Sequence, residues 1–184
     1  MLKTLSGLKI ADFSMFVAGP FATSILADLG AEVIKIEPIS GDPLRANKVG
    51  PLVSGGSAQF QTFNHGKKSV SLDLKEENDL DKAKKIALSS DVIFDNFRPG
   101  VMEKFGLDHA SLVKDHPALV SISLSGFGTI SPLAKNPGYD LIVQALDCCD
   151  LIVQAFGCCD LIAQSFGCCD LIAEAFGCCD LIIQ

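Results

Sequence analysis

Short apolar runs and longer amphipathic stretches alternate along the first 128 residues of the chain. Apolar runs bounded by turn residues predict buried strands, and stretches with apolar residues three or four positions apart predict helices. We expect strands at 8–13, 32–37, 69–75, 91–97 and 118–128, and helices at 20–30, 77–90, 101–106 and 109–115. Residues 48–66 are Gly-rich and show neither pattern, so we expect irregular structure there. Strands separated by helices in this order predict an α/β fold, a Rossmann-like parallel sheet with helices on both faces.

A ten-residue repeat begins where this alternation ends. The segments DLIVQALDCC, DLIVQAFGCC, DLIAQSFGCC, DLIAEAFGCC and DLIIQ follow one another from Asp140 to Gln184. Ten residues advance an α-helix by about 1000°, about 80° short of three turns, so equivalent side chains would form no straight stripe. Leu or Phe at every fifth residue is loosely similar to pentapeptide-repeat β-helices. We therefore divide the chain into a domain at 1–146 and a repeat tail at 147–184. A helical cap, a β-helical cap and a tandem expansion without the variety of a packed core all stay open for the tail.

Charge and cysteine content also change near this boundary. The chain has 15 Lys and Arg against 22 Asp and Glu, a net charge of −7, but residues 141–184 hold six of the acids and no base. All eight cysteines lie there too, as adjacent pairs without C-x-x-C spacing, which argues against a metal site and favours cross-linking of chains under oxidising conditions. No cluster of bases suits a nucleic acid, and no uncharged run reaches the roughly 18 residues of a membrane span. We expect a cytoplasmic protein without nucleic-acid or membrane partners.

In parallel sheets of this kind, ligands bind beyond the carboxyl ends of the strands, which here points to the loops at 14–20, 38–43, 96–100 and 125–139. The loops lack G-x-G-x-x-G, and the nearest approach, SGFGTIS, has neither the third glycine nor the helix that should follow. A G-x-x-x-x-G-K-[ST] phosphate loop is also absent from the sequence. The three histidines suit surface or loop positions better than catalytic ones. The sequence therefore predicts neither a dinucleotide site nor a P-loop.

The loops and their flanking strands carry a more specific pattern. LSGLKIADFSMFVAGPFATSILADLGAEVIKIEP, FNHGKKSVSLDLK, DVIFDNFRPGVMEKFGL, SLSGFG and PGYDLIVQA occur in this order over about residues 5–146. Together they resemble the amino-terminal half of the family III CoA-transferases (CaiB/BaiF type), the group of formyl-CoA transferase, carnitine CoA-transferase and α-methylacyl-CoA racemase. The resemblance implies a domain that binds coenzyme A or acyl-CoA as a substrate, with a carboxylic acid as second substrate and no tightly bound cofactor. It also implies interlocked homodimers of chains roughly twice this length, an assembly that we do not expect of this chain without its second half.

The resemblance further implies which positions contact CoA. Carried over by position, they are Val17, Ala18, Pro38, Leu72, Asp73, Leu74, Lys75, Asn96, Phe97, Arg98, Lys104, Gly138, Tyr139 and Asp140. Lys75, Arg98 and Lys104 can neutralise the nucleotide phosphates, and the backbone N–H groups of Val17 and Ala18 could face the thioester. Lys75 and Lys104 also suit ordinary solvated helix edges, and Pro38 stands where some members have a cationic residue. No residue is expected to bind a metal.

Two further positions concern catalysis. Racemase-like members have His before the Asp of a G-H-D motif, whereas this chain has Tyr139, and a phenol with a pKa of about 10 is a poor base at neutral pH. The resemblance is therefore to the transferases, in which a carboxylate attacks the acyl-CoA to give a mixed anhydride and an aspartate then carries CoA as a thioester before an acceptor acid takes it. That aspartate lies roughly thirty residues beyond the G-Y-D motif, where this chain has Asp170 in the repeat, so we assign no catalytic residue.

We expect a CoA-transferase-like protein that by itself has little or no activity. The alternative is a non-catalytic, truncated CoA-binding fragment with a repeat-expanded tail.

Overall fold

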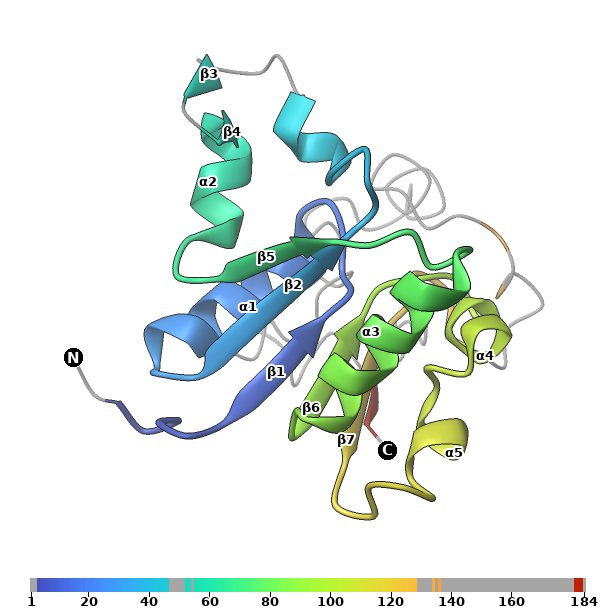
Figure 1. The fold of residues 1–184 in the computed structure, drawn as a ribbon. Helices are drawn as coiled ribbons and strands as arrows, with labels where there is room; N and C mark the ends of the chain where they lie inside the picture. Colours follow the sequence, from blue (N-terminus) through green and yellow to red (C-terminus); the bar gives the residue numbers. More distant parts are fainter. Residues whose placement is uncertain are drawn as a thin grey trace, which may run out of the picture.

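A computed structural model describes residues 3–46, 52–53, 55–128, 134, 136 and 181–183. Its main element is a six-stranded sheet with the order β5-β2-β1-β6-β7-β8 (Figure 1). The strands are β1 (Lys9–Asp12), β2 (Glu32–Glu37), β5 (Lys68–Ser71), β6 (Val92–Asp95), β7 (Val120–Leu124) and β8 (Leu181–Ile183). Neighbouring strands from β5 to β7 are parallel, and β8 runs antiparallel to β7. The predicted parallel sheet is confirmed.

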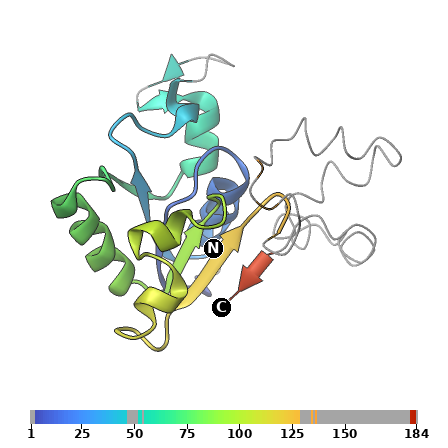
Figure 2. The ribbon, with the colours of Figure 1, turned by 90° about the vertical axis from the view of Figure 1, so that its right-hand side faces the viewer.

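Helices cover both faces of the sheet, as the sequence predicts. They are α1 (Ala18–Asp28), α2 (Ala58–Asn64), α3 (Glu77–Leu88), α4 (Val101–Phe105) and α5 (His109–Leu112), and a 3-10 turn, η1, spans Pro43–Ala46. The helix α1 lies on one face, and α3, α4 and α5 lie on the other (Figures 1 and 2). Predicted and observed bounds agree to within a few residues, and β2 agrees at both ends.

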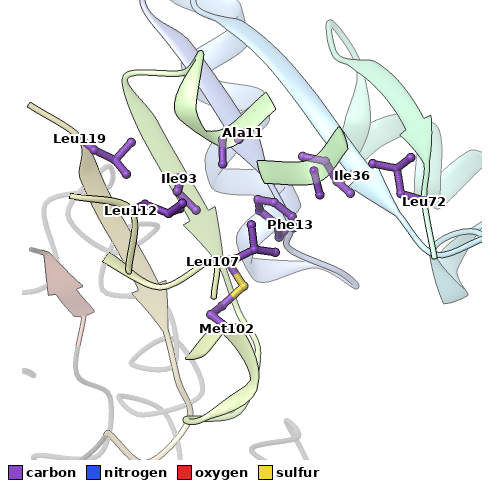
Figure 3. Close-up of a cluster of buried hydrophobic side chains, with 11 residues drawn as sticks. Ala11, Phe13, Ile36, Leu72, Ile93, Met102, Leu107, Leu112 and Leu119 are labelled. Atoms are coloured by element: carbon purple, nitrogen blue, oxygen red, sulfur yellow. The ribbon is translucent and has the colours of Figure 1, made fainter. Parts of the chain in front are cut away.

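Two apolar clusters fill the spaces between the sheet and its helices. Ile10 of β1 packs with Ala22 on the α1 side. Ala11 and Ile93 pack with Leu107 on the opposite side (Figure 3). Ile10 and Ala11 are successive residues of β1, yet they belong to different clusters because side chains alternate along a strand. The sheet is therefore buried on both faces, which explains the nearly continuous apolar runs of its central strands.

The prediction of irregular structure at residues 48–66 is wrong. Leu52–Val53 (β3) pairs antiparallel with Gly56–Ser57 (β4), and α2 follows directly. The Ser57 hydroxyl caps α2 by accepting a hydrogen bond from the Phe60 backbone N–H at 3.0 Å. The ring of Phe63 packs edge-on against Phe21 of α1, with centroids 5.8 Å apart. The glycines before this seven-residue helix hid it from pattern analysis.

The strand β8 comes from the last copy of the repeat, of which the structure describes only Leu181–Ile183. Its register pairs Ile122 with Ile183, Ser123 with Ile182 and Leu124 with Leu181.

Several predictions concern residues outside the described part of the chain. These are the repeat up to Asp180, the domain boundary at 146/147, Asp170, and the predicted CoA contacts Gly138, Tyr139 and Asp140. Within the described residues, no helix combines the length and hydrophobicity needed to cross a bilayer.

Candidate functional site

The strand order reverses direction between β1 and β6. From β1 the chain adds β2 and then β5 on one side, and it afterwards adds β6 and β7 on the other side. In open parallel sheets, ligands bind at the carboxyl ends of the strands beside such a switch point. The predicted loops at 14–20, 38–43 and 96–100 follow β1, β2 and β6, so the structure brings three of the four together along this edge, with 72–75 after β5 beside them. Most of the fourth, 125–139, lies outside the described residues.

The side chain of Asn96 joins the loops on the two sides of the switch point. Its amide nitrogen donates to the Met15 carbonyl at 2.8 Å, and its oxygen accepts from the Met15 N–H at 2.9 Å. Two residues before Met15 and Asn96, the Phe13 N–H donates to the Phe94 carbonyl at 2.7 Å. Because both ends of the Asn96 carboxamide are engaged with the backbone, this residue can serve a ligand chiefly by holding the Met15 loop in place.

The loop after β1 is strained where it enters α1. Phe16 has a φ of +65°, although it is not a glycine, and its side chain is 44% exposed. A bulky residue in this left-handed conformation costs free energy, and such strain is concentrated at functional sites. Val17 follows as the N-cap of α1 and makes no side-chain cap hydrogen bond.

The start of α1 is positioned by close packing on the same loop. A Cβ atom on Gly19 would lie 2.3 Å from the Cβ atom of Ser14, so only glycine allows the helix to approach the loop this closely. The first N–H groups of a helix have no intrahelical acceptor, and the helix dipole adds positive potential there. The beginning of α1, at Ala18 and Gly19, can therefore receive an anionic or carbonyl oxygen of a ligand.

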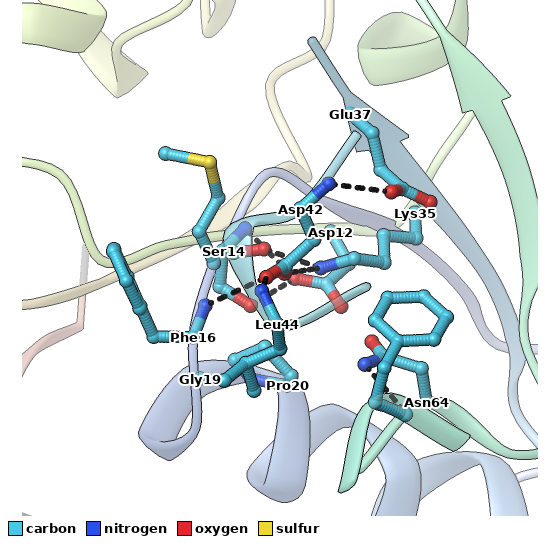
Figure 4. Close-up of polar contacts among 12 residues, drawn as sticks. Asp12, Ser14, Phe16, Gly19, Pro20, Lys35, Glu37, Asp42, Leu44 and Asn64 are labelled. Atoms are coloured by element: carbon cyan, nitrogen blue, oxygen red, sulfur yellow. Dashed lines mark hydrogen bonds and ion pairs between the residues drawn. The ribbon is translucent and has the colours of Figure 1, made fainter. Parts of the chain in front are cut away.

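A first group of buried charges supports the β1 loop and α1, and Figure 4 shows its Asp12 beside Ser14. Asp12, at the end of β1, is fully buried and accepts hydrogen bonds from the Ser14 backbone N–H at 2.9 Å and from the Thr23 hydroxyl at 2.6 Å. The Lys67 ammonium contacts the Asp12 carboxylate at 3.0 Å and the Asn64 side-chain oxygen at 3.1 Å, and it also donates to the Pro20 carbonyl at 2.7 Å. Burial lowers the pKa of Lys67 to about 8, despite the raising effect of Asp12.

A second group supports the loop after β2. The buried Lys35 ammonium donates to the Ser14 carbonyl at 2.6 Å and forms an ion pair with Asp42 at 3.0 Å, so it links the β1 and β2 loops. Glu37 receives two hydrogen bonds from Arg45, each of 2.6 Å, and one from the Asp42 backbone N–H at 2.9 Å. Burial by itself would raise the pKa of Glu37, but the hydrogen bonds from Arg45, Ser69 and Asp42 lower it to about 2.

Sequence reasoning missed both groups of charges. Their signal is a charged residue within a run that otherwise predicts a buried strand, as with Asp12 in KIAD and with Lys35 and Glu37 in EVIKIE. Buried charges occur where they are paired, and here three acids (Asp12, Glu37, Asp42) balance three bases (Lys35, Arg45, Lys67). The two groups hold in place the backbone beneath the carboxyl ends of the strands, which we call the ligand edge. Other residues are the ones that would contact a ligand there.

A small cavity of about 110 Å³ lies on the β7 side of the same edge. Asp95, at the end of β6, and Arg98 line it together with Ser123 and Ser125 of the β7 segment. Burial raises the pKa of Asp95 to about 6, although hydrogen bonds from the Phe97 N–H and Ser123 lower it. His109 also lines this cavity, whereas His65 is exposed and pairs with Asp28 at 2.9 Å. Among the described residues, no cluster of three or more His, Cys, Asp or Glu side chains could hold a metal ion.

The remaining predicted contacts differ in accessibility. Lys75 and Lys104 are exposed, and Pro38 opens the exposed loop after β2. Leu72, by contrast, is buried and donates its N–H to the Glu37 carbonyl at 2.8 Å. Asp73 begins the turn into α3, where its carboxylate accepts from the Lys75 N–H at 3.0 Å.

Leu74 and Phe97 are half-buried against the α3-side cluster. Arg98 is exposed beside the cavity. Exposed cations and an uncapped helix start thus follow the carboxyl ends of neighbouring strands, an arrangement that can bind an anionic ligand.

Comparison with known proteins gives a consistent family. The model of "CoA-transferase family III" matches residues 5–150. The acetyl-CoA:oxalate CoA-transferase of Acetobacter aceti is 45% identical over 141 residues, which cover 76% of this chain and 36% of that protein. The succinyl-CoA:glutarate CoA-transferase of Mus musculus is 37% identical over 146 residues, covering 79% of this chain and 33% of that protein. The chain thus spans about a third of the length of these relatives.

Solved structures agree with the sequence relatives. A CAIB/BAIF family protein from Brucella suis superposes with a TM-score of 0.72 at 37% identity, over 77% of this chain and 38% of that one. A protein from Mycobacterium tuberculosis superposes with a TM-score of 0.72 at 32% identity, over 95% of this chain and 53% of that one.

Proposed function

Because the chain belongs to CoA-transferase family III, we propose that residues 5–150 form the coenzyme A-binding part of an enzyme that moves CoA between two carboxylic acids. The observation that carries this proposal is the edge beside the switch point, where an uncapped helix start and several cations lie at the ends of neighbouring strands. The relatives named above are called CoA-transferases of oxalate and glutarate. A small carboxylic acid is therefore the second substrate that we propose, with no tightly bound cofactor.

We assign the predicted contacts to separate parts of the CoA molecule. Lys75, Arg98 and Lys104 neutralise its phosphates, because flexible or forked cations at an accessible edge suit phosphate oxygens. Val17 and Ala18 direct N–H groups toward the thioester carbonyl, where the helix start stabilises negative charge.

Other contacts surround the adenine ring or act through the backbone. The half-buried Leu74 and Phe97 supply apolar surface, Pro38 and Asp73 flank it, and the buried Leu72 acts through its backbone. Asn96 acts through its two hydrogen bonds to Met15. Gly138, Tyr139 and Asp140 remain predicted contacts.

For turnover we propose the family's route. An aspartate carboxylate of the enzyme attacks the thioester carbonyl of the acyl-CoA and expels the CoA thiolate, which leaves a mixed anhydride of the acyl group and the aspartate. The thiolate then attacks the aspartyl carbonyl of that anhydride to form an aspartyl thioester and release the first acid, and the acceptor acid finally takes the CoA. Residues 5–150 match the family, whereas this nucleophile is expected beyond them, in the repeat. We therefore propose that the chain binds CoA but exchanges it slowly or not at all; a non-catalytic CoA-binding fragment is the second candidate.

Binding is tested by thermal unfolding of the full, reduced chain with and without CoA at millimolar concentration. Ligand that binds the folded state raises the midpoint, by the equivalent of about 2.7 kcal/mol when its concentration is 100 times Kd. Arg98→Ala should reduce the shift. Lys114→Ala, which removes an exposed lysine beyond α5, should leave it unchanged. Pantetheine, which lacks the nucleotide phosphates, should shift the midpoint less than CoA. A midpoint that CoA does not move would overturn the binding proposal.

Turnover is tested separately by exchange of labelled CoA between two acids, such as acetate and oxalate. We expect no exchange above the rate without protein. Sustained exchange that Asp170→Ala abolishes would show instead that the chain is a complete transferase.

A further inference from the structure

We propose that the outer edge of β8 is a docking site for the repeat segment of a second copy of this chain. The strand β8 ends the sheet, and within the described residues no strand pairs with its outer side. An open strand edge presents unpaired N–H and carbonyl groups, which bind another extended segment through backbone hydrogen bonds.

The two edges of the sheet differ in their protection. At the opposite edge, β5 begins with Lys68, an exposed lysine that pairs with Glu32 at 2.6 Å. Charges of this kind discourage the addition of further strands. By contrast, β8 has the sequence Leu-Ile-Ile, and residues 141–184 contain no Lys, Arg or Pro. The β8 edge therefore lacks the lysines and prolines with which many natural sheets discourage edge-to-edge association.

The chain also carries the segment that fits this edge. The triplet Asp-Leu-Ile that leads into β8 at 180–182 recurs at 150–152, 160–162 and 170–172, and also at 140–142. Backbone pairing is insensitive to side chains, and identical sequences stack with matching side chains in extended sheets. Every copy of the triplet can therefore pair in the same way with β8, which itself contains part of one copy.

The resulting assembly is open-ended. A repeat segment of one molecule pairs with β8 of another, so the two contacting surfaces differ, and such heterologous contacts generate chains unless a rotation closes them. Each added molecule brings its own β8 edge and its own spare triplets. We expect oligomers whose size increases with protein concentration and which do not depend on disulfides.

The test uses the full chain with all eight cysteines replaced by serine, studied by sedimentation velocity over a range of concentrations. The weight-average mass should rise about twofold or more as the concentration is raised. Ile142→Pro, Ile152→Pro, Ile162→Pro and Ile172→Pro together disrupt the four spare triplets, because proline donates no hydrogen bond, yet they leave the β8 sequence intact. This variant should remain close to the monomer mass at all concentrations. Equal association of the proline variant and the Cys-free parent would overturn the proposal.

A matched control places the same number of prolines between the triplets. Asp147→Pro, Gly157→Pro, Gly167→Pro and Gly177→Pro should leave the association unchanged. Loss of association in this variant would mean that prolines act through the tail in general, which would overturn the assignment to the triplets.

Hydrogen exchange localises the contact. Amides of Leu181–Ile183 should become more protected as the Cys-free chain is concentrated, while those of β5 (Lys68–Ser71) should not change. Concentration-dependent protection at β5 and none at β8 would also refute the docking site.

Discussion

Replacement of Glu37 by glutamine tests whether the buried charges support the ligand edge. The Glu37 carboxylate is 1% exposed and is held by Arg45, Ser69 and the Asp42 N–H. Its pKa is about 2 in the folded protein against 4.5 for an ordinary glutamate, and this difference corresponds to about 3 kcal/mol of stability at pH 7. The glutamine side chain would keep the shape but turn an NH₂ donor toward groups that are themselves donors. We expect Glu37→Gln to lower the free energy of unfolding by about 3 kcal/mol at pH 7.

The pH dependence gives the sharper test. Because the folded pKa is depressed, the stabilisation is fully present above pH 4.5 and is lost as the pH falls toward 2. Urea unfolding of the reduced protein at several pH values should therefore show a gap between wild type and Glu37→Gln that narrows steeply below pH 4.5. Glu32→Gln is the control on the same strand, because the Glu32–Lys68 pair is exposed and should affect stability little. A gap that is the same at pH 7 and at about pH 2.5, or no gap at pH 7, would refute the reasoning.

Three further substitutions probe the same edge. Asp95→Asn should abolish a pH dependence that we expect of the wild type. The stability of the wild type should fall as the pH rises from about 4 to about 6, because over this range the folded carboxyl still holds its proton whereas the unfolded carboxyl has lost it. In urea at pH 7 the variant should be more stable by up to about 3 kcal/mol, and unchanged pH slopes would contradict this. Asn96→Ala should cost about 2–4 kcal/mol, because two hydrogen bonds are lost and both polar groups of Met15 lose their partner; a change in the urea midpoint worth under about 1 kcal/mol would count against the clamp. Gly19→Ala should cost about 1–3 kcal/mol through its contact with Ser14, and Ser14→Gly in the same chain should recover part of that loss.

The sequence predicts the layers of this fold because its local and long-range preferences agree. The run EVIKIE has three β-branched apolar residues among its six and is bounded by Gly30 and Pro38, so the pattern predicts β2 with both of its ends. Gly30 is expected to end α1, and it adopts a φ of +104° directly after the C-cap. The helix α2 escapes prediction because it is held by the cap from Ser57 and by the edge-on packing of Phe63 against Phe21, and neither contact leaves a periodic pattern.

The candidate site was predictable only in outline. Strand ends indicate where a ligand edge lies, and the order of the strands then brings the loops together. The pairing of Lys35 with Asp42 or of Lys67 with Asp12 depends on how the chain returns to itself, since Lys67 and Asp12 are 55 residues apart in sequence. The positive φ of Phe16 likewise belongs to the loop that packs against the start of α1, and it has no counterpart in composition or periodicity.

The clamp between Asn96 and Met15 has a consequence for the order in which the molecule is made. It joins residues 81 positions apart, and β1, β2 and β5 all precede Asn96 in the chain. During synthesis at about 5–20 residues per second, the β1 loop would wait roughly 4–16 s for its partner. The ligand edge is thus completed only when β6 docks beside β1, whatever has folded before. A ligand that touches both loops would select finished sheets over nascent ones, and its presence in the cell would favour the maturation of this domain.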